Sequence, residues 1–206
     1  MKKILFFFMT AIAMLFTACQ SCGTQPAPEQ KDTAVVIASD DWNVLIEKSV
    51  IAIQATYPEY TFYEASGNLK KINLQDVTWG VDRNTFQIVF GKINGNATVI
   101  GTIKNDTLKL EQVDEPWLED VHTTPFVALD LDYAIKKIQE AIDVEFEEGT
   151  PAVFRFQLFY SIYEPEYLIG DWRTCHSIKA YSGKVDEPLK GAKGLCAKQP
   201  GFAEKK

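Results

Sequence analysis

The chain has 206 residues, of which 46% are hydrophobic and 12% aromatic, and its formal net charge at pH 7 is −7. The hydrophobic content is enough to build a packed core, which excludes a chain that is disordered throughout. The acidic balance disfavours nucleic acid as a partner, because phosphate backbones repel a negatively charged surface. For the same reason, the protein gains little electrostatic attraction to anionic lipids.

The N-terminal segment has the three regions of a secretory signal. Two lysines precede an apolar run from Ile4 to Phe16, and small residues then lead into Cys19. The segment Phe16-Thr17-Ala18-Cys19 resembles the lipobox of bacterial lipoproteins, in which the cysteine is diacylated and becomes the new N-terminus. The apolar run is shorter than the ~20 residues that span a bilayer. We therefore expect residues 1–18 to be a signal peptide and Cys19 to carry lipid; an ordinary cleaved signal and a membrane span are the alternatives.

Residues 19–38 are expected to form a lipidated, flexible linker. Removing 18 of 206 residues leaves 188, and the loss of two lysines takes the formal charge from −7 to −9. A Pro-Ala-Pro step keeps the linker extended, and acyl chains would supply the membrane attachment. No acidic run follows Cys19, whereas surface-exported lipoproteins of Bacteroides relatives usually carry one. We therefore expect an envelope protein anchored to the outer membrane and facing the periplasm.

The first half of the domain reads as a helix followed by strands. Ser39 or Asp40 can cap a helix whose apolar positions recur at three- and four-residue steps until Pro58 stops it. Period-two alternation and turn residues then predict strands at 73–81, 85–93, 97–104 and 107–113. The Asn94-Gly95 pair is the strongest hairpin signal. Such tight connections favour an antiparallel meander.

The second half repeats this order after a connector at 114–128. Asp130 can cap a helix at 131–143, and strands are predicted at 153–163, 167–170, 173–181 and 184–186, with a turn at Ser182-Gly183. Because helix and strands occur twice, we predict an α+β fold of two helix-plus-antiparallel-sheet units packed together. The units would cover residues 39–115 and 129–206.

Short motifs in both halves resemble PepSY domains. Asp130–Ile135 resembles the opening of their helix, and residues 164–170 and 177–185 resemble their closing strands. Ala52–Pro58 is similar to the helix end of the PepSY-like, beta-lactamase-inhibitor-like proteins of Bacteroides and its relatives. The first half departs from the pattern, since it has an extra hairpin and Gly67–Gln75 looks like an insertion. The resemblance implies tandem PepSY-like units that bind or inhibit proteins, with no catalytic residues to carry over.

Two of the four cysteines are expected to form a disulfide. Cys175 and Cys196 lie in the same C-terminal region, and an extracytoplasmic compartment allows disulfides to persist. Closing this loop would contribute ~3 kcal/mol and would tie the lysine-rich tail to a strand. Cys22 remains in the linker, and the cysteine spacing gives no zinc pattern. Cys175 and His176 cannot form a catalytic dyad, because adjacent strand residues point to opposite faces.

The remaining candidates are carboxylates, aromatics and threonines. Acidic residues gather at 111–120 and 143–148, where they could serve glycoside hydrolysis or calcium binding, but a solvated acidic surface is the simpler interpretation. Three aromatics of the C-terminal half are candidates for an exposed binding surface for a protein or a sugar: Phe159, Tyr163 and Trp172. Thr33 and Thr107 stand in sequences that resemble the O-glycosylation sequon of Bacteroides envelope proteins.

These observations predict a membrane-anchored lipoprotein that is not an enzyme and acts as a protein-binding or inhibitory module. Its partner would be an envelope protein such as a peptidase. A glycan-binding accessory lipoprotein is the alternative, and an enzyme that uses a carboxylate pair is a third reading. We expect no metal, no cofactor and no nucleic acid among its ligands.

Overall fold

The computed structural model describes residues 34–118, 120–127, 129–157, 164–171, 174–186 and 189–190. From Ala34 onward these residues belong to one compact unit. Within these ranges, neither helix is long and apolar enough to cross a membrane.

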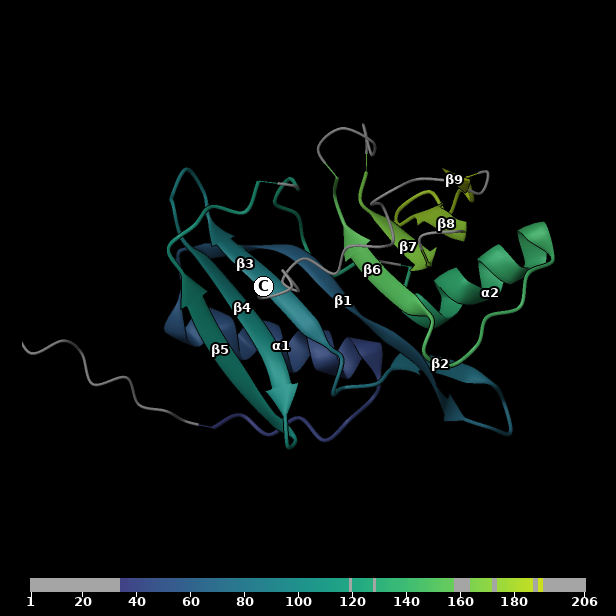
Figure 1. Ribbon diagram of the computed structural model, residues 1–206, viewed down its shortest axis with the longest axis horizontal. Helices are drawn as coiled ribbons and strands as arrows, with labels where there is room; N and C mark the ends of the chain where they lie inside the picture. Colours follow the sequence, from purple (N-terminus) through teal and green to yellow (C-terminus); the bar gives the residue numbers. More distant parts are fainter. Residues whose placement is uncertain are drawn as a thin grey trace, which may run out of the picture. The chain divides into compact units, whose positions relative to one another are not determined.

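The described chain forms two helices and a nine-stranded antiparallel sheet (Figure 1). The strand order is β5-β4-β3-β1-β6-β7-β8-β9, and β2 pairs separately with β1. The predicted α+β class with an antiparallel sheet is confirmed. The elements in chain order are α1 (Trp42–Thr56), β1 (Tyr60–Asn73), β2 (Thr78–Val81), β3 (Gln87–Lys92), β4 (Thr98–Lys104), β5 (Thr107–Val113), α2 (Leu131–Ile142), β6 (Pro151–Arg155), β7 (Glu166–Gly170), β8 (Thr174–Lys179) and β9 (Leu189–Lys190).

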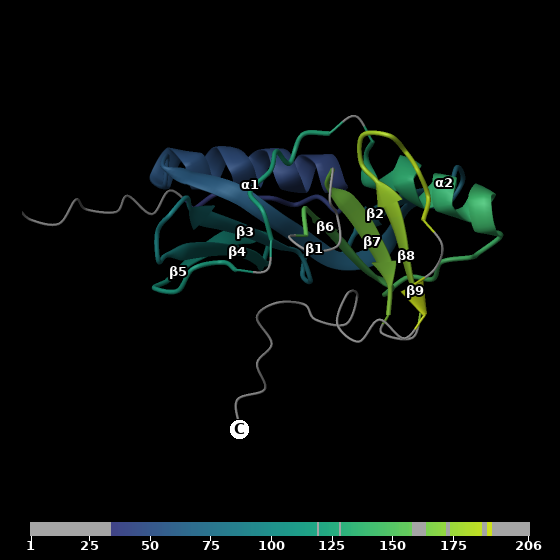
Figure 2. The ribbon, with the colours of Figure 1, turned by 90° about the horizontal axis from the view of Figure 1, so that it is seen from above.

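The two halves share one sheet, joined where β1 pairs with β6. Glu64 stands opposite Arg155 at this joint, and Ala65 stands opposite Phe154. From the joint, β3, β4 and β5 follow outward on one side, and β7, β8 and β9 follow on the other. The strand order is therefore symmetric about the β1–β6 pair. Both helices lie on the same face of the sheet (Figure 2), where their buried residues belong to one core.

Helix α1 begins one residue later than a cap at Asp40 would place it and two residues later than a cap at Ser39 would. The cap is Asp41 and not Ser39 or Asp40, since the Asp41 carboxylate accepts a hydrogen bond from the Val44 amide at 3.0 Å. The helix ends before Pro58, and the Tyr57 amide donates to the Ile53 carbonyl. Helix α2 has the predicted cap, since Asp130 accepts from the Tyr133 amide at 2.8 Å.

The main error of the sequence-based prediction is that it missed β1. The predicted strand at 73–81 is in fact the end of β1, a turn at 74–77, and β2. The segment 67–75, read as an insertion, is the second half of β1 and the start of this turn. β1 lacks a simple alternation because most of it is buried on both faces and a bulge between Phe62 and Glu64 shifts its register.

The C-terminal strands differ from prediction in smaller ways. Residues 184–186 do not form a strand; Val185 makes a single bridge to Ile178. β6 covers only Pro151–Arg155, and the predicted continuation over 158–163 lies outside the described residues. β9 was not expected, because a two-residue strand has no periodicity to detect.

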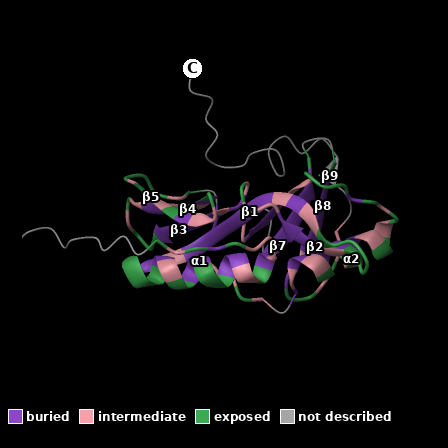
Figure 3. Cartoon of the chain, turned by 90° about the horizontal axis from the view of Figure 1, so that it is seen from below, coloured by how far each residue is buried: buried purple, intermediate pink, exposed green. Residues whose placement is uncertain are grey.

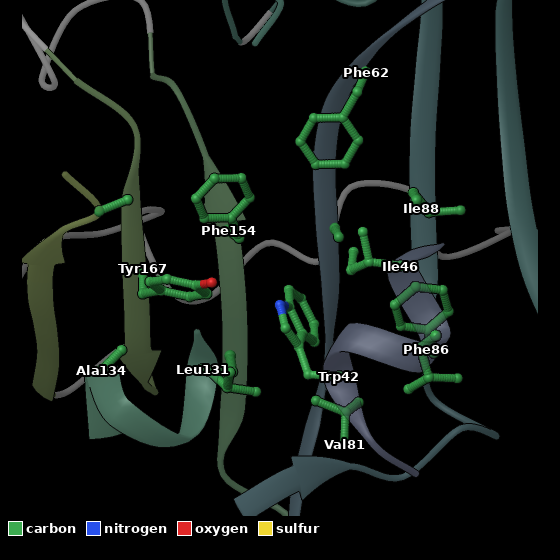
Figure 4. Close-up of a cluster of buried hydrophobic side chains, with 14 of the residues drawn as sticks. Trp42, Ile46, Phe62, Val81, Phe86, Ile88, Leu131, Ala134, Phe154 and Tyr167 are labelled. Atoms are coloured by element: carbon green, nitrogen blue, oxygen red, sulfur yellow. The ribbon is translucent and has the colours of Figure 1, made fainter. Parts of the chain in front are cut away.

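The core lies between the helices and the sheet, and aromatic rings connect its two halves. The Trp42 indole of α1 lies between Phe86 and Tyr167, with centroid distances of 6.0 and 6.2 Å (Figure 4). Phe154 stacks on Phe62 across the β1–β6 joint with 5.9 Å between the ring centroids. The centroid of Phe154 also lies 4.9 Å from that of Tyr167. Figure 3 shows that the strands are mostly buried, whereas both helices also carry exposed residues. The shared core makes one folding unit of the described halves.

Candidate functional site

Most of the site residues predicted from the sequence lie outside the described residues. Only Cys175 and Thr107 fall within them. The lipid attachment, the aromatic binding surface, the disulfide and one glycosylation site therefore stay predictions; the residues outside are Cys19, Thr33, Phe159, Tyr163, Trp172 and Cys196.

Cys175 and Thr107 occupy different parts of the sheet. Cys175 in β8 is buried with Val153 and Leu168 on the face opposite the helices. The next residue, His176, points to the helix side, where its ring meets Phe146 at 5.6 Å. Thr107 is half-buried at the start of β5, and its hydroxyl donates to the Asn105 carbonyl at 3.3 Å.

The helix-free face of the second half carries a buried row of alternating charges. Four side chains stand directly opposite one another on consecutive strands of the sheet, and we call them the buried row: Glu64, Arg155, Glu166 and Lys179. Lys179 contacts Glu166 at 2.6 Å, and Arg155 lies 3.6 Å from Glu64 and 3.8 Å from Asp120. Ion pairing of this kind compensates the cost of burying charge. At these positions the face is part of the interior, whereas the sequence suggested an open binding surface on this half of the sheet.

The same face of the first half is more open. A hollow of about 560 Å³ lies over β3, β4 and β5. Much of its lining is amide, hydroxyl or charged: Asn68, Asn84, Thr85, Gln87, Thr102, Lys104 and Glu111. Such groups can donate and accept hydrogen bonds with a polar ligand.

The hairpin of β1 and β2 extends away from the other strands (Figure 1) and ends in exposed aliphatic side chains. Leu74 is 79% exposed, Val77 44% and Ile72 37%. The turn is ordered by its own polar groups, since Asn73 Oδ1 accepts from the Gln75 amide at 2.9 Å. We call residues 72–77 the hairpin tip.

The base of the hairpin is held to the start of α1 by Asp40. Its carboxylate binds Lys70 at 2.7 Å and the Arg83 guanidinium at 3.1 Å, and Arg83 also contacts Asp106 at 2.6 Å. Burial alone would raise the pKa of Asp40, but hydrogen bonds from Lys70 and the Arg83 amide, with their charges, hold it below its usual value. At Gly80 a side chain cannot fit, because a Cβ atom would lie 2.1 Å from the Asp40 carbonyl oxygen.

The other side of the hairpin contacts α2 and the loop that follows it. The Trp79 amide donates to Asp132 at 2.8 Å, and the Lys71 amide donates to Glu148 at 2.9 Å. Lys71 Nζ also lies over the Trp79 ring, 5.2 Å from its centroid. The stem is therefore fixed on two sides while the tip faces solvent.

A second hollow, of about 640 Å³, brings the acidic segment after α2 together with the β7–β8 turn. Glu145, Glu147 and Glu148 line it with Asp171 and His176. From the sequence, a solvated surface was the favoured interpretation of these glutamates over hydrolysis or calcium binding, because nothing local links them to the other two residues. Burial lowers the pKa of His176. Within the described ranges, there is no cluster of three or more histidine, cysteine, aspartate or glutamate side chains that could hold a metal ion.

Comparison with known proteins adds little to this geometry. No protein-family model matches the chain, and no curated protein matches it. A solved structure described as a "putative lipoprotein" from Clostridium difficile 630 superposes with a TM-score of 0.42 at 11% sequence identity, covering 76% of this chain and 99% of that one. Similarity at this level carries no argument about function.

Proposed function

We propose that the protein is a lipid-anchored envelope lipoprotein that binds another protein without catalysing a reaction, and that the hairpin tip makes the contact. The observation that carries this proposal is the exposure of Ile72, Leu74 and Val77 on a projecting hairpin whose stem is fixed. Single exposed aliphatic residues are ordinary, but a cluster on a protruding element is typical of an interaction site.

The energetics favour a protein surface as the ligand. Burying an aliphatic side chain fully contributes about 1.5–3 kcal/mol, and an ordered hairpin has little conformational entropy to lose on binding. The flanking Lys71 would lie at the rim of such a contact, where a charge influences the association rate more than the affinity.

The N-terminal signal and the symmetric strand order support the rest of the proposal. Cys19 would carry the lipid and the linker would hold the domain on the periplasmic side of the outer membrane. The two halves would be PepSY-like units that fuse their sheets at the β1–β6 pair. Among envelope proteins, a peptidase is the partner that the family resemblance favours.

A glycan-binding lipoprotein is the second candidate, and the hollow over β3, β4 and β5 favours it. Asn68, Gln87 and Thr102 offer the hydrogen-bonding groups that recognise hydroxyls. No aromatic side chain other than Phe86, whose own exposure is 1%, lines this hollow among the described residues, so a stacking platform for a sugar ring is missing there.

A pull-down tests the role of the hairpin tip. The mature protein is used as bait in solubilised envelope extracts, beside the double variant Leu74→Gln/Val77→Gln and the control Ile51→Gln/Ile93→Gln. The control changes two aliphatics of similar exposure, 62% and 45%, away from the tip. We expect the recovered partner to fall at least tenfold with the tip variant and to be retained with the control.

Equal recovery with both variants would overturn the role of the hairpin tip. Glycan-array binding that is lost in Gln87→Ala, with no protein recovered, would establish the second candidate instead. Lipidation is tested separately, because Cys19→Ala should leave unprocessed precursor or release the protein from the membrane fraction.

A further inference from the structure

The hollow that follows α2 opens beside the hairpin tip. Glu148 in its lining accepts a hydrogen bond from the Lys71 amide at 2.9 Å, and Lys71 directly precedes Ile72, the first residue of the tip. The same segment is fastened to β1, since the Leu69 amide donates to the Thr150 carbonyl at 2.8 Å. Figure 1 shows the segment between α2 and β6 running back to this hairpin. A protein that covers the tip on this side therefore comes within reach of the hollow.

Two carboxylates of the hollow are available to a cationic group. Glu148 is engaged with the hairpin, and Asp171 accepts from the Thr174 amide at 3.0 Å. Glu145 and Glu147 are exposed lining residues, and within the described part of the chain neither carboxylate makes a hydrogen bond or an ion pair. No lysine or arginine is found among the described lining residues. A concave surface whose available charges have one sign concentrates ligands of the opposite sign.

His176 provides an independent indication that the hollow receives a ligand with N–H donors. Its ring lines the hollow and is only 6% exposed, and its Nδ1 atom has no hydrogen-bond partner within the described residues. Burial keeps the pKa of His176 below its ordinary value, so the ring is neutral at pH 7 and one nitrogen is an acceptor. A buried acceptor without a partner is costly, and a donor that reached it would recover part of this cost.

We propose that the hollow takes a lysine side chain of the protein that binds the hairpin tip, an inference that rests on the function proposed above. The ammonium group lies between the Glu145 and Glu147 carboxylates and donates to the His176 imidazole. Its three N–H donors match these three acceptors, whereas the planar fork of an arginine is best suited to a single carboxylate. Val144 and Pro151, which also line the hollow, cover the aliphatic stem. The partner therefore presents a lysine beside an apolar pocket.

Titration with a lysine peptide tests the hollow in the absence of the natural partner. The probe is acetyl-Gly-Lys-Gly amide, and its counterpart carries norleucine, which has a similar aliphatic stem and no charge. At constant ionic strength, we expect the lysine peptide to cause saturable NMR shifts of the amides at 144–149 and of the His176 ring protons. The norleucine peptide should cause severalfold smaller shifts. Equal shifts with the two peptides, or none at these positions, would overturn the proposal.

Matched glutamate variants provide the second measurement. Glu145→Gln/Glu147→Gln removes the two available charges of the hollow, and Glu47→Gln/Glu115→Gln removes two charges from exposed positions elsewhere. The shifts caused by the lysine peptide should disappear in the hollow variant and persist in the control. Shifts that survive in the hollow variant would place the lysine elsewhere and refute the inference.

The same variants separate this inference from the function on which it rests. As bait in envelope extracts, the hollow variant should recover severalfold less partner than its glutamate control. Full recovery with the hollow variant, beside loss with the hairpin-tip variant, would overturn the lysine contact and leave the hairpin contact intact. Full recovery with the hairpin-tip variant, beside loss with the hollow variant, would instead overturn the hairpin contact and support the lysine site.

Discussion

Lys179 and Glu166 face each other across β7 and β8, with 2.6 Å between Nζ and Oε2. Their side chains are 17% and 5% exposed, and Asp186 approaches the same ammonium at 3.5 Å. Because both charges are largely removed from water, each depends on the other for compensation. The pair ends the row of alternating charges that runs from Glu64 across the sheet.

Removing one member of this pair should destabilise the fold more than removing a surface ion pair. For Glu166→Gln we expect the free energy of unfolding to fall by about 3 kcal/mol, because a largely buried ammonium loses its closest anion. Urea denaturation followed by circular dichroism measures the change. Lys136→Gln is the control, since its contact with Asp132 is solvent-exposed on the lysine side and should contribute under ~1 kcal/mol. Equal losses in the two variants would contradict the structural role of the buried row.

Tyr167 gives a second test of the core at the joint between the halves. Its hydroxyl donates to the Leu129 carbonyl at 2.9 Å, and burial raises its pKa, so it remains a neutral donor. Tyr167→Phe keeps the ring but leaves that carbonyl without this donor, and we expect a loss of about 1–2 kcal/mol. Tyr181→Phe, at a 56% exposed position, should cause no measurable loss.

The helices and the tight turns were predictable because their signals are local. Asp130 caps α2 as expected, and Asn94 adopts the positive φ of 57° that an Asn-Gly turn favours. β1 lacked such a signal: Glu64 and Ser66 are polar yet buried, and the bulge breaks the alternation that would mark a strand. The pairing of β1 with β6 depends on contacts between distant segments, so no pattern within either half could reveal it.

The candidate sites show the same division between local and distant information. The hairpin tip could have been suspected, since Ile72, Leu74 and Val77 are aliphatic residues within a largely polar stretch. The hollow lined by Glu145, Glu147 and Glu148 could not, because His176 and Asp171 come from another part of the sheet. The chosen aromatic surface rested on extending one alternation through residues 158–163, which lie outside the described ranges.

Asp40 is expected to control how firmly the hairpin is attached. Asp40→Asn removes the negative charge between Lys70 and Arg83, so we expect about 1–2 kcal/mol lower stability and faster hydrogen exchange in β2. The pKa of Asp40 is lower in the folded than in the unfolded chain. Its contribution to the free energy of unfolding is therefore complete above the unfolded pKa of ~3.9 and is lost as the pH falls through the folded pKa. Asp41→Asn is the neighbouring control, since asparagine caps a helix about as well as aspartate. Slower exchange in Asp40→Asn would refute the clamp.

His176 should make stability depend on pH near neutrality. Burial lowers the pKa of His176 in the folded state, so between that value and the unfolded value of ~6.5 the unfolded chain binds more protons. The free energy of unfolding should therefore be highest above pH ~6.5 and should decrease as the pH falls below it. His176→Phe, which keeps a ring against Phe146, should reduce this slope between pH 7 and 5. Titration of the His176 ring protons by NMR measures the folded pKa directly, and a value at or above 6.5 would contradict the expectation.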